Sequence, residues 1–177
     1  MKLKFFCSVA MVCFMSSVAF AQSVYVDYDH SLDFSQFHTY AWGQQPNPNQ
    51  IKSPFLAQEA QTQINSQLQS RGLQLVQESQ NPDLIVVASG GMKTQVSYNA
   101  WGTGGWRWGG GMGTITPEQS VIGTLVVDLY DTKAKQMAWR GTSQGTLNES
   151  NSEKNRRLVD KAVAKMFQKY PSPSNNK

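Results

Sequence analysis

The sequence predicts an α+β fold in which a mostly antiparallel sheet carries two amphipathic helices packed on one face. Several segments alternate apolar and polar residues, which is typical of strands with one buried side. Two other segments place apolar residues at helical spacing, one over residues 54–71 and one after Ser150. The 177 residues suffice for one domain with a substantial core, which we expect over residues 22–170.

The first 21 residues have the features of a secretory signal peptide. Two lysines precede an apolar stretch, and Ala-Phe-Ala at positions 19–21 forms an A-x-A cleavage site before Gln22. A membrane-spanning helix needs roughly 20 apolar residues, and this stretch is shorter. We therefore expect cleavage after residue 21 and a protein that is periplasmic or associated with the outer membrane.

Cleavage would leave a mature chain with little reactive chemistry. It would remove Cys7 and Cys13, so neither a disulfide nor a thiol nucleophile would remain. Neither cysteine follows a small residue, as a lipid-anchor cysteine would, and we expect a soluble mature protein. Two positive charges of the formal net +4 also leave with Lys2 and Lys4, so overall charge gives no argument for a nucleic acid partner.

Strands are expected at residues 24–28, 39–42 and 83–88. The first alternates apolar and polar residues, and the last is a near-continuous apolar run that is typical of a central strand. Gly90 and Gly91 predict a bulge or a turn before the next strand begins.

The first helix is expected over residues 54–71. Ser53 can cap a free backbone amide, and the proline that follows it needs no hydrogen-bond acceptor at the first helical position. Gly72 suits the position after the last turn. The second helix is expected to open at Ser150, because Glu153 lies at the spacing of a capping box.

A long hairpin is expected near the end of the domain. Residues 124–131 and 136–147 alternate apolar and polar residues on either side of a polar connection at 132–135. In that arrangement Asp128 and Arg140 are expected to form a structural pair across the two strands.

A Gly/Trp-rich loop is expected at residues 99–119, since seven of the 14 glycines lie in residues 102–113. Exposed tryptophans stack on sugars or lie at membrane interfaces, and arginine adds contacts with anions. Alternatively, the tryptophans cover an exposed part of the core. The tail at 171–177 is expected to be disordered. The predicted ligand-binding residues are Trp101, Trp106, Arg107 and Trp108.

A series of short segments resembles the bacterial domain of unknown function 4136 family, over about residues 24–170. The resemblance implies an exported envelope protein, in many members a lipoprotein, with no established activity. This chain lacks the lipid-anchor cysteine, and its Gly/Trp-rich insert is not part of the family pattern. The matching segments are Val26-Asp27-Tyr28-Asp29, Asp33-Phe34-Ser35, Thr39-Tyr40-Ala41-Trp42, Asn81-Pro82-Asp83-Leu84, residues 123–129 and Trp139-Arg140-Gly141.

One cluster of residues could bind a divalent metal ion. It combines histidine nitrogens with carboxylate oxygens, and both ligand types bind such ions. The alternative is an Asp-rich strand end whose side chains cap turns and backbone amides, and we predict no metal there. The cluster consists of Asp27, Asp29, His30, Asp33 and His38.

Other catalytic and cofactor motifs are missing from the sequence. No G-x-S-x-G motif is present, and Arg107 stands where G-x-G-x-x-G would need glycine, so we expect no nucleotide or other small-molecule cofactor. Basic residues at Arg157, Lys161, Lys165 and Lys169 follow one side of the last helix. They indicate either a solvated outer face or a surface for anionic lipid.

Our leading hypothesis is a non-enzymatic periplasmic or cell-envelope binding or scaffold protein. It would act through the Gly/Trp-rich loop or an exposed sheet surface on a partner protein, a glycan or a membrane face. The alternative is a small hydrolase or metal-dependent enzyme that uses the cluster between Asp27 and His38. An enzyme requires a concave pocket with converging polar groups, whereas a binding protein can show an exposed aromatic patch and no such pocket.

Overall fold

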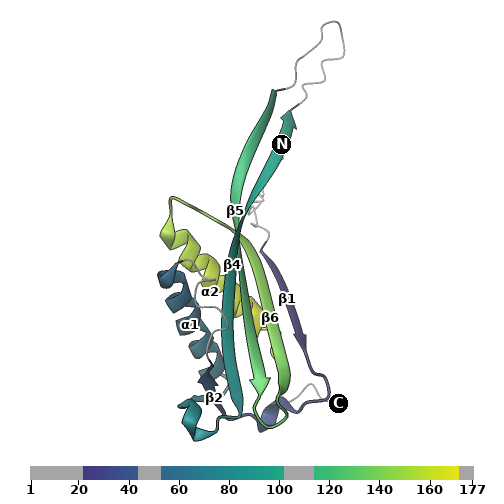
Figure 1. The fold of residues 1–177 in the computed structure, drawn as a ribbon, viewed down its shortest axis with the longest axis vertical. Coiled ribbons are helices and arrows are strands. Elements are labelled where there is room, and N and C mark those ends of the chain that lie inside the picture. Colours follow the sequence, from purple (N-terminus) through teal and green to yellow (C-terminus); the bar gives the residue numbers. More distant parts are fainter. Residues whose placement is uncertain (1–21, 44–52, 102–113, 172–177) are drawn as a thin grey trace, which may run out of the picture.

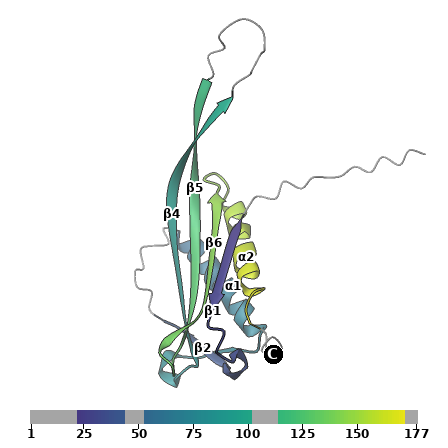
Figure 2. The same ribbon diagram turned by 90° about the vertical axis from the view of Figure 1, so that its right-hand side faces the viewer.

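The computed structural model describes residues 22–43, 53–101 and 114–171. Its strands form one six-stranded sheet in the order β1-β6-β5-β4-β2-β3, and both helices lie on the same side of it (Figure 1, Figure 2). Neighbouring strands are antiparallel except where β2 pairs with β3 and with β4. The predicted α+β fold is confirmed. Its elements are β1 (Ser23–Tyr28), η1 (Phe34–Gln36), β2 (Thr39–Trp42), α1 (Pro54–Gln69), β3 (Gln74–Leu75), η2 (Glu78–Gln80), β4 (Leu84–Trp101), β5 (Thr114–Asp131), β6 (Gln136–Leu147) and α2 (Ser152–Phe167).

The first helix begins where the sequence predicts, and the second does not. Ser53 accepts a hydrogen bond from the Leu56 amide at the start of α1, and Gly72 has a φ of 88° after its end. The predicted capping box at Ser150 is wrong, because Asn151 caps α2 by accepting from the Lys154 amide at 2.9 Å. In the part of the chain that the structure describes, no helix has the length and apolar character needed to cross a membrane.

Strand β4 is much longer than the sequence predicts. Gly90 and Gly91 form neither a turn nor a bulge, because β4 pairs with β5 in one unbroken register from Leu84 opposite Asp131 to Trp101 opposite Thr114. The predicted loop at residues 99–119 is therefore too long at both ends. Its first residues belong to β4 and its last ones to β5.

The predicted hairpin of β5 and β6 is confirmed around the turn at 132–135. Its register shifts between Leu129 and Tyr130, where β6 carries one extra residue. Asp128 lies opposite Arg140 and accepts two hydrogen bonds from its guanidinium group, at 2.6 and 2.7 Å. This pair lies on the face of the sheet away from the helices, because the neighbouring Leu129 is in the core.

The core lies between the helices and the lower part of the sheet. Trp139 is fully buried, and its ring centroid is 5.0 Å from that of Phe167 on α2. Glycine at position 141 allows this packing, since a Cβ atom there would lie 2.5 Å from the Trp139 ring. The buried apolar side chains include Tyr40, Ala60, Ile64, Leu68, Leu84, Val86, Val127, Leu129, Val163 and Met166.

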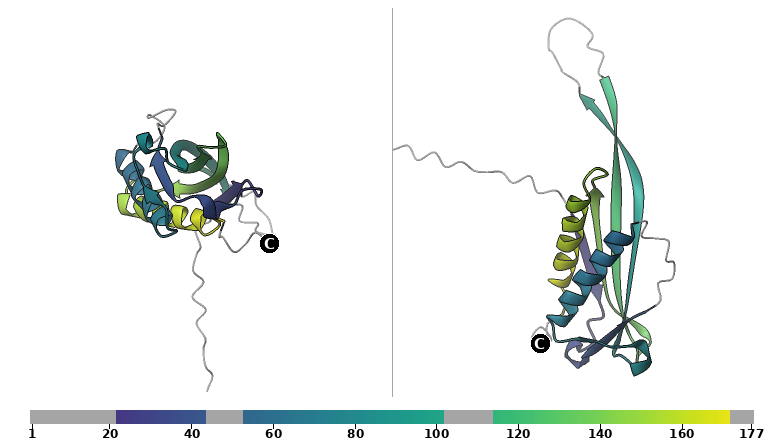
Figure 3. Two further views of the ribbon diagram at one scale, coloured as in Figure 1. Left: turned by 90° about the horizontal axis from the view of Figure 1, so that it is seen from below. Right: turned by 90° about the vertical axis from the view of Figure 1, so that its left-hand side faces the viewer.

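Above the core, β4 and β5 continue as a two-stranded ribbon that extends past the helices (Figure 3). Strand β6 ends at Leu147, which is opposite Val121. Beyond that level β4 and β5 pair only with each other among the described residues, from Gln95 opposite Ser120 to the ends of both strands. We call residues 95–101 and 114–120 the ribbon.

Candidate functional site

A groove of about 910 Å³ lies where the ribbon leaves the helical layer. One wall is the start of α1, the other is the segment that joins β6 to α2, and the sheet forms the floor. We call it the ribbon-base groove. Its apolar side chains are Phe55, Leu56, Met92, Val121 and Leu147, and its polar ones include Gln58, Glu59, Thr62, Asn148, Glu149, Asn155 and Arg156.

Phe55 is the most prominent apolar side chain of this groove. It is 78% exposed, although it belongs to the first turn of a well-formed helix. The buried residues of α1 recur at every fourth position, from Ala60 through Ile64 to Leu68, and Phe55 lies off this stripe. The helix therefore buries its stripe against the core and leaves Phe55 beside the groove, where a partner can contact it.

The apolar lining continues inward into a small cavity between the sheet and both helices. The cavity has a volume of about 70 Å³ and shares Leu56, Met92 and Leu147 with the groove. On the sheet side its lining includes Gly91, and a Cβ atom added there would have no neighbour within 4 Å. The groove thus has an apolar recess with room for a few carbon atoms.

Charged groups gather on the helices beside the groove. Arg156 of α2 forms an ion pair with Glu59 of α1 at 3.0 Å. Hydrogen bonds from Gln63 and Arg156 lower the pKa of the Glu59 carboxyl. Burial and the negative charge of Glu59 raise the pKa of Asp160, one of whose oxygens is buried without a hydrogen-bond partner. The Glu59–Arg156 ion pair therefore links α1 to α2 at one end of the groove.

The predicted ligand-binding residues lie at or beyond the end of the ribbon. Trp101 is the last residue of β4, opposite Thr114, and its side chain lies outside what the structure describes. Trp106, Arg107 and Trp108 fall wholly outside the described residues, as do residues 172–177 of the tail predicted at 171–177. Their proposed role in binding stays a prediction.

The structure does not gather the cluster between Asp27 and His38 into one site. Asp29 accepts hydrogen bonds from both the amide and the hydroxyl of Ser31, at 2.8 and 2.6 Å. Asp33 binds Ser35 in the same way, at 2.9 and 2.7 Å. These carboxylates cap turns, as the alternative interpretation expects. Among the described residues, no three side chains of His, Cys, Asp or Glu lie close enough together to hold a metal ion.

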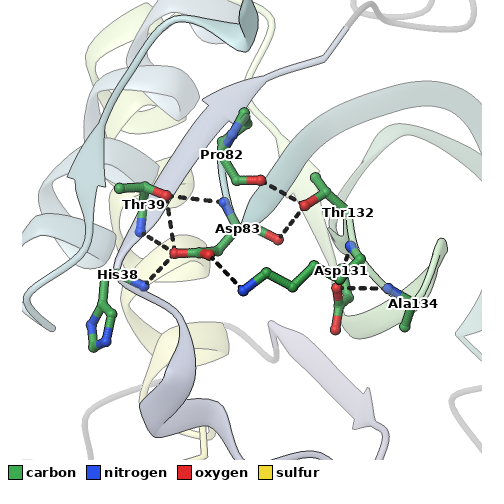
Figure 4. Close-up of polar contacts among 8 residues, drawn as sticks. His38, Thr39, Pro82, Asp83, Asp131, Thr132 and Ala134 are labelled. Carbon is green, nitrogen blue, oxygen red and sulfur yellow. Dashed lines mark hydrogen bonds and ion pairs between the residues drawn. The ribbon is translucent and has the colours of Figure 1, made fainter. Parts of the chain in front are cut away.

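The sequence analysis missed the polar centre of the lower end of the domain, which is Asp83 (Figure 4). Its carboxylate accepts hydrogen bonds from the backbone amides of His38 and Thr39 at 3.0 and 3.1 Å, and from the Thr39 hydroxyl at 3.0 Å. Lys133 adds an ion pair at 3.4 Å. Asp83 therefore joins the start of β2, the start of β4 and the turn between β5 and β6.

The bonds around Asp83 explain its electrostatics. Burial alone would raise the pKa of this carboxyl, but the hydrogen bonds from His38 and Thr39, together with Lys133, hold it below the usual value. The Thr132 hydroxyl donates to the carbonyl oxygen of Pro82 at 2.6 Å and closes the network on the other side. These bonds join three segments of the chain, so the arrangement stabilises the lower end of the domain.

Comparisons with known proteins agree with this architecture. A DUF4136 family protein from Bacteroides thetaiotaomicron VPI-5482 has a similar structure, with a TM-score of 0.55 and 16% identity, over 88% of this chain and 98% of that one. A PDZ domain protein from Parabacteroides distasonis ATCC 8503 gives a TM-score of 0.52 at 15% identity. That match covers 85% of this chain and 36% of the other, so the chain spans about a third of that protein's length. No curated protein matches the sequence significantly.

At such identities these likenesses concern the fold alone. The family itself is established by the sequence, because the family model for the domain of unknown function DUF4136 matches residues 24–172. The match covers β1 to α2, all the elements that the structure describes except the first residue of β1. The chain therefore belongs to the DUF4136 family.

Proposed function

We propose that this protein is a non-enzymatic binding or scaffold protein of the cell envelope, and that it holds a partner protein in the ribbon-base groove. The observation that carries the proposal is the combination of a large open groove, an apolar floor and an exposed phenylalanine at its side. Exposed apolar surface of this kind marks sites of interaction between proteins.

The shape of the groove favours a protein partner over a small polar ligand. Its floor consists of apolar side chains, and the recess behind it is also mainly apolar. Polar groups lie on the rim, which is the usual arrangement of an interface with an apolar centre. Apolar side chains of a partner would fill the floor, and the partner's polar groups would meet Asn148, Asn155 and the Glu59–Arg156 pair.

The location in the envelope is part of the same proposal. The signal peptide expected at residues 1–21 supports it. Mass spectrometry of the purified protein should find a mature chain that begins at Gln22 and carries no lipid. An intact amino terminus, or an acyl group on Cys7 or Cys13, would contradict the proposed location.

The proposed function can be tested by site-specific photo-crosslinking in the envelope. A photoreactive phenylalanine analogue at position 55 should give a discrete adduct, and Met92→Glu should abolish it, because this change puts a charge on the apolar floor. The matched control carries the analogue at Leu75, which is 46% exposed at the far end of the domain. Identical adducts from both positions, or an adduct that survives Met92→Glu, would refute binding in the groove.

The predicted role of the Gly/Trp-rich loop needs its own test. Changing Trp106 and Trp108 together to alanine should weaken partner or glycan binding and leave the melting temperature nearly unchanged. A loss of several kcal/mol, as expected for buried aromatic residues, would instead show that the two side chains cover part of the core.

A further inference from the structure

The edges of the sheet differ in how they are protected against pairing with another strand. A free edge presents unpaired N–H and C=O groups, and proteins block such edges with prolines, charges or very short strands. One edge strand of the six-stranded sheet is β3, which has only two residues. The other is β1, and the ribbon adds two more edges, one along β4 and one along β5.

Side chains of the protein block the edge of β1. The Asp29 amide donates to the Ala138 carbonyl oxygen of β6, so odd-numbered residues at this edge direct their N–H and C=O groups toward β6. Because these groups alternate along a strand, the even-numbered residues of β1 direct theirs away from the sheet. The Val24 carbonyl oxygen accepts a hydrogen bond from the Lys169 ammonium group at 3.4 Å. The Tyr28 amide donates to the Asp27 carboxylate at 3.0 Å. Two outward groups of this edge are therefore already occupied.

The direction of the backbone groups in β4 follows from two hydrogen bonds. The Gly43 amide donates to the carbonyl oxygen of Val86, so the N–H and C=O groups of even-numbered residues in β4 face the β2 side of the strand. The Thr132 amide donates to the carbonyl oxygen of Asp83, so the N–H and C=O groups of odd-numbered residues face β5. The register with β5 has no shift, and this alternation holds to the end of the strand.

The same alternation shows which edge of the ribbon is blocked. Tyr98 is even-numbered, so its backbone groups face away from β5. Pro117 lies opposite Tyr98 in a pair without mutual hydrogen bonds, so its backbone nitrogen faces away from β4. The nitrogen of Pro117 faces the outer edge of β5, where proline provides no N–H group. Residues 88–100 of β4 include no proline. On the edge of β4 that faces away from β5, no described residue pairs with them.

We propose that the outer edge of β4 in the ribbon pairs with the same edge of a second copy of this chain, antiparallel about a two-fold axis near Val96. Both copies then contribute the N–H and C=O groups of their even-numbered residues, and the two sheets join into one. This surface is the backbone edge of β4, whereas the ribbon-base groove is lined by side chains, so the inference goes beyond the proposed function.

Side-chain chemistry favours a second copy as the occupant of this edge. Val96 is 42% exposed near the base of the ribbon, and a two-fold axis there sets it against its counterpart, so that both become buried. The only charged residue of β4 is Lys93, which this pairing places opposite Asn99 of the second copy. Like charges therefore do not meet. A two-fold contact also closes on itself and forms no filament.

The test compares proline on the two edges of the ribbon. Val96→Pro removes an outward N–H group from β4, and Gln119→Pro removes the equivalent group from β5, because these residues lie opposite each other. Both changes leave the hydrogen bonds between β4 and β5 intact. Sedimentation analysis of the mature chain should show a dimer for the wild type and for Gln119→Pro, and a monomer for Val96→Pro.

A second pair of variants covers the possibility that proline disturbs the fold. Val96→Lys sets two ammonium groups against each other at the axis and should also abolish the dimer, whereas Gln119→Lys should not. In the cysteine-free mature chain, Val96→Cys should crosslink to itself under oxidation and Gln119→Cys should not. A wild type that stays monomeric, a Gln119 variant that loses the dimer, or a Val96→Cys chain that crosslinks to another protein would overturn the proposal.

Discussion

Two regions of the molecule share the same pair of strands and differ in what covers them. In the lower part of β4, Leu84 and Val86 are fully buried beneath the helices, whereas Val96 in the ribbon is 42% exposed on the same face. The pairing with β5 is unbroken throughout. Backbone hydrogen bonding is therefore the same in both regions, and only side-chain packing separates them. A two-stranded ribbon without such packing is marginally stable in isolation.

The largest expected effect comes from the packed region. Trp139→Ala removes a fully buried aromatic side chain that packs against Phe167, and it should lower the free energy of unfolding by about 3–5 kcal/mol. Phe55→Ala removes a side chain of similar size that is exposed at the groove, and it should change stability by less than about 0.5 kcal/mol. Chemical denaturation of both variants measures the difference, and similar losses would contradict the division into two regions.

A smaller loss is expected at the polar centre of the packed region. Asp83→Ala leaves the amides of His38 and Thr39 without their acceptor and should cost about 2 kcal/mol, or roughly 4–8 °C in melting temperature. Lys133→Ala removes only the exposed ion pair and should cost less than about 0.5 kcal/mol. Equal losses in the two variants would show that the ion pair, and not the backbone bonds, stabilises this end.

The pH dependence of this effect has a definite sign. The pKa of Asp83 is lower in the folded protein than in the unfolded chain. Its contribution is therefore present above the unfolded pKa of about 3.9 and is lost as the pH falls through the folded value. Wild type and Asp83→Ala should accordingly converge in stability on acidification, which thermal melts between neutral pH and pH 3 would show.

The division between the two regions also explains what sequence alone could predict. Local signals predicted the Ser53 cap of α1 correctly, but they placed the cap of α2 at Ser150 instead of Asn151. The segments that carry the family resemblance turn out to serve the packed region: Asp83 joins three segments, Trp139 fills the core, and Gly141 leaves space for its ring. These roles depend on contacts between distant residues, so the sequence marked the residues without showing what they do.

The ribbon and the groove could not be predicted for a related reason. Gly90 and Gly91 are typical of turns, and only the unbroken pairing with β5 keeps them in a strand. The groove combines side chains from α1, β4, β5 and β6, which no local pattern brings together. A signal was present at Phe55, whose position off the buried stripe of α1 predicts exposure.

A gain in stability is expected at one position between the helices. The pKa of Asp160 is raised in the folded state, so its carboxyl group stabilises the fold below the unfolded pKa, and this contribution is lost as the pH rises through the folded value. Asp160→Asn should therefore raise stability at pH 7 by about 1 kcal/mol and give no gain near pH 4. The exposed Glu149→Gln is the control and should change stability little at either pH. A gain from Asp160→Asn that is the same at both pH values would exclude this explanation.

A last comparison makes one substitution at two positions on the same face of β4. Val86→Thr buries a hydroxyl group in the core and should cost about 1–3 kcal/mol. Val96→Thr places the same group on the exposed face of the ribbon, ten residues further along the strand, and should change stability by less than about 0.5 kcal/mol. Threonine keeps the shape and the strand preference of valine in both variants. The two positions therefore differ only in whether the helices bury the side chain. Melts at a protein concentration low enough to keep the chain monomeric avoid any contribution from self-association. A cost at Val96 as large as that at Val86 would mean that the ribbon is packed against something as firmly as the core.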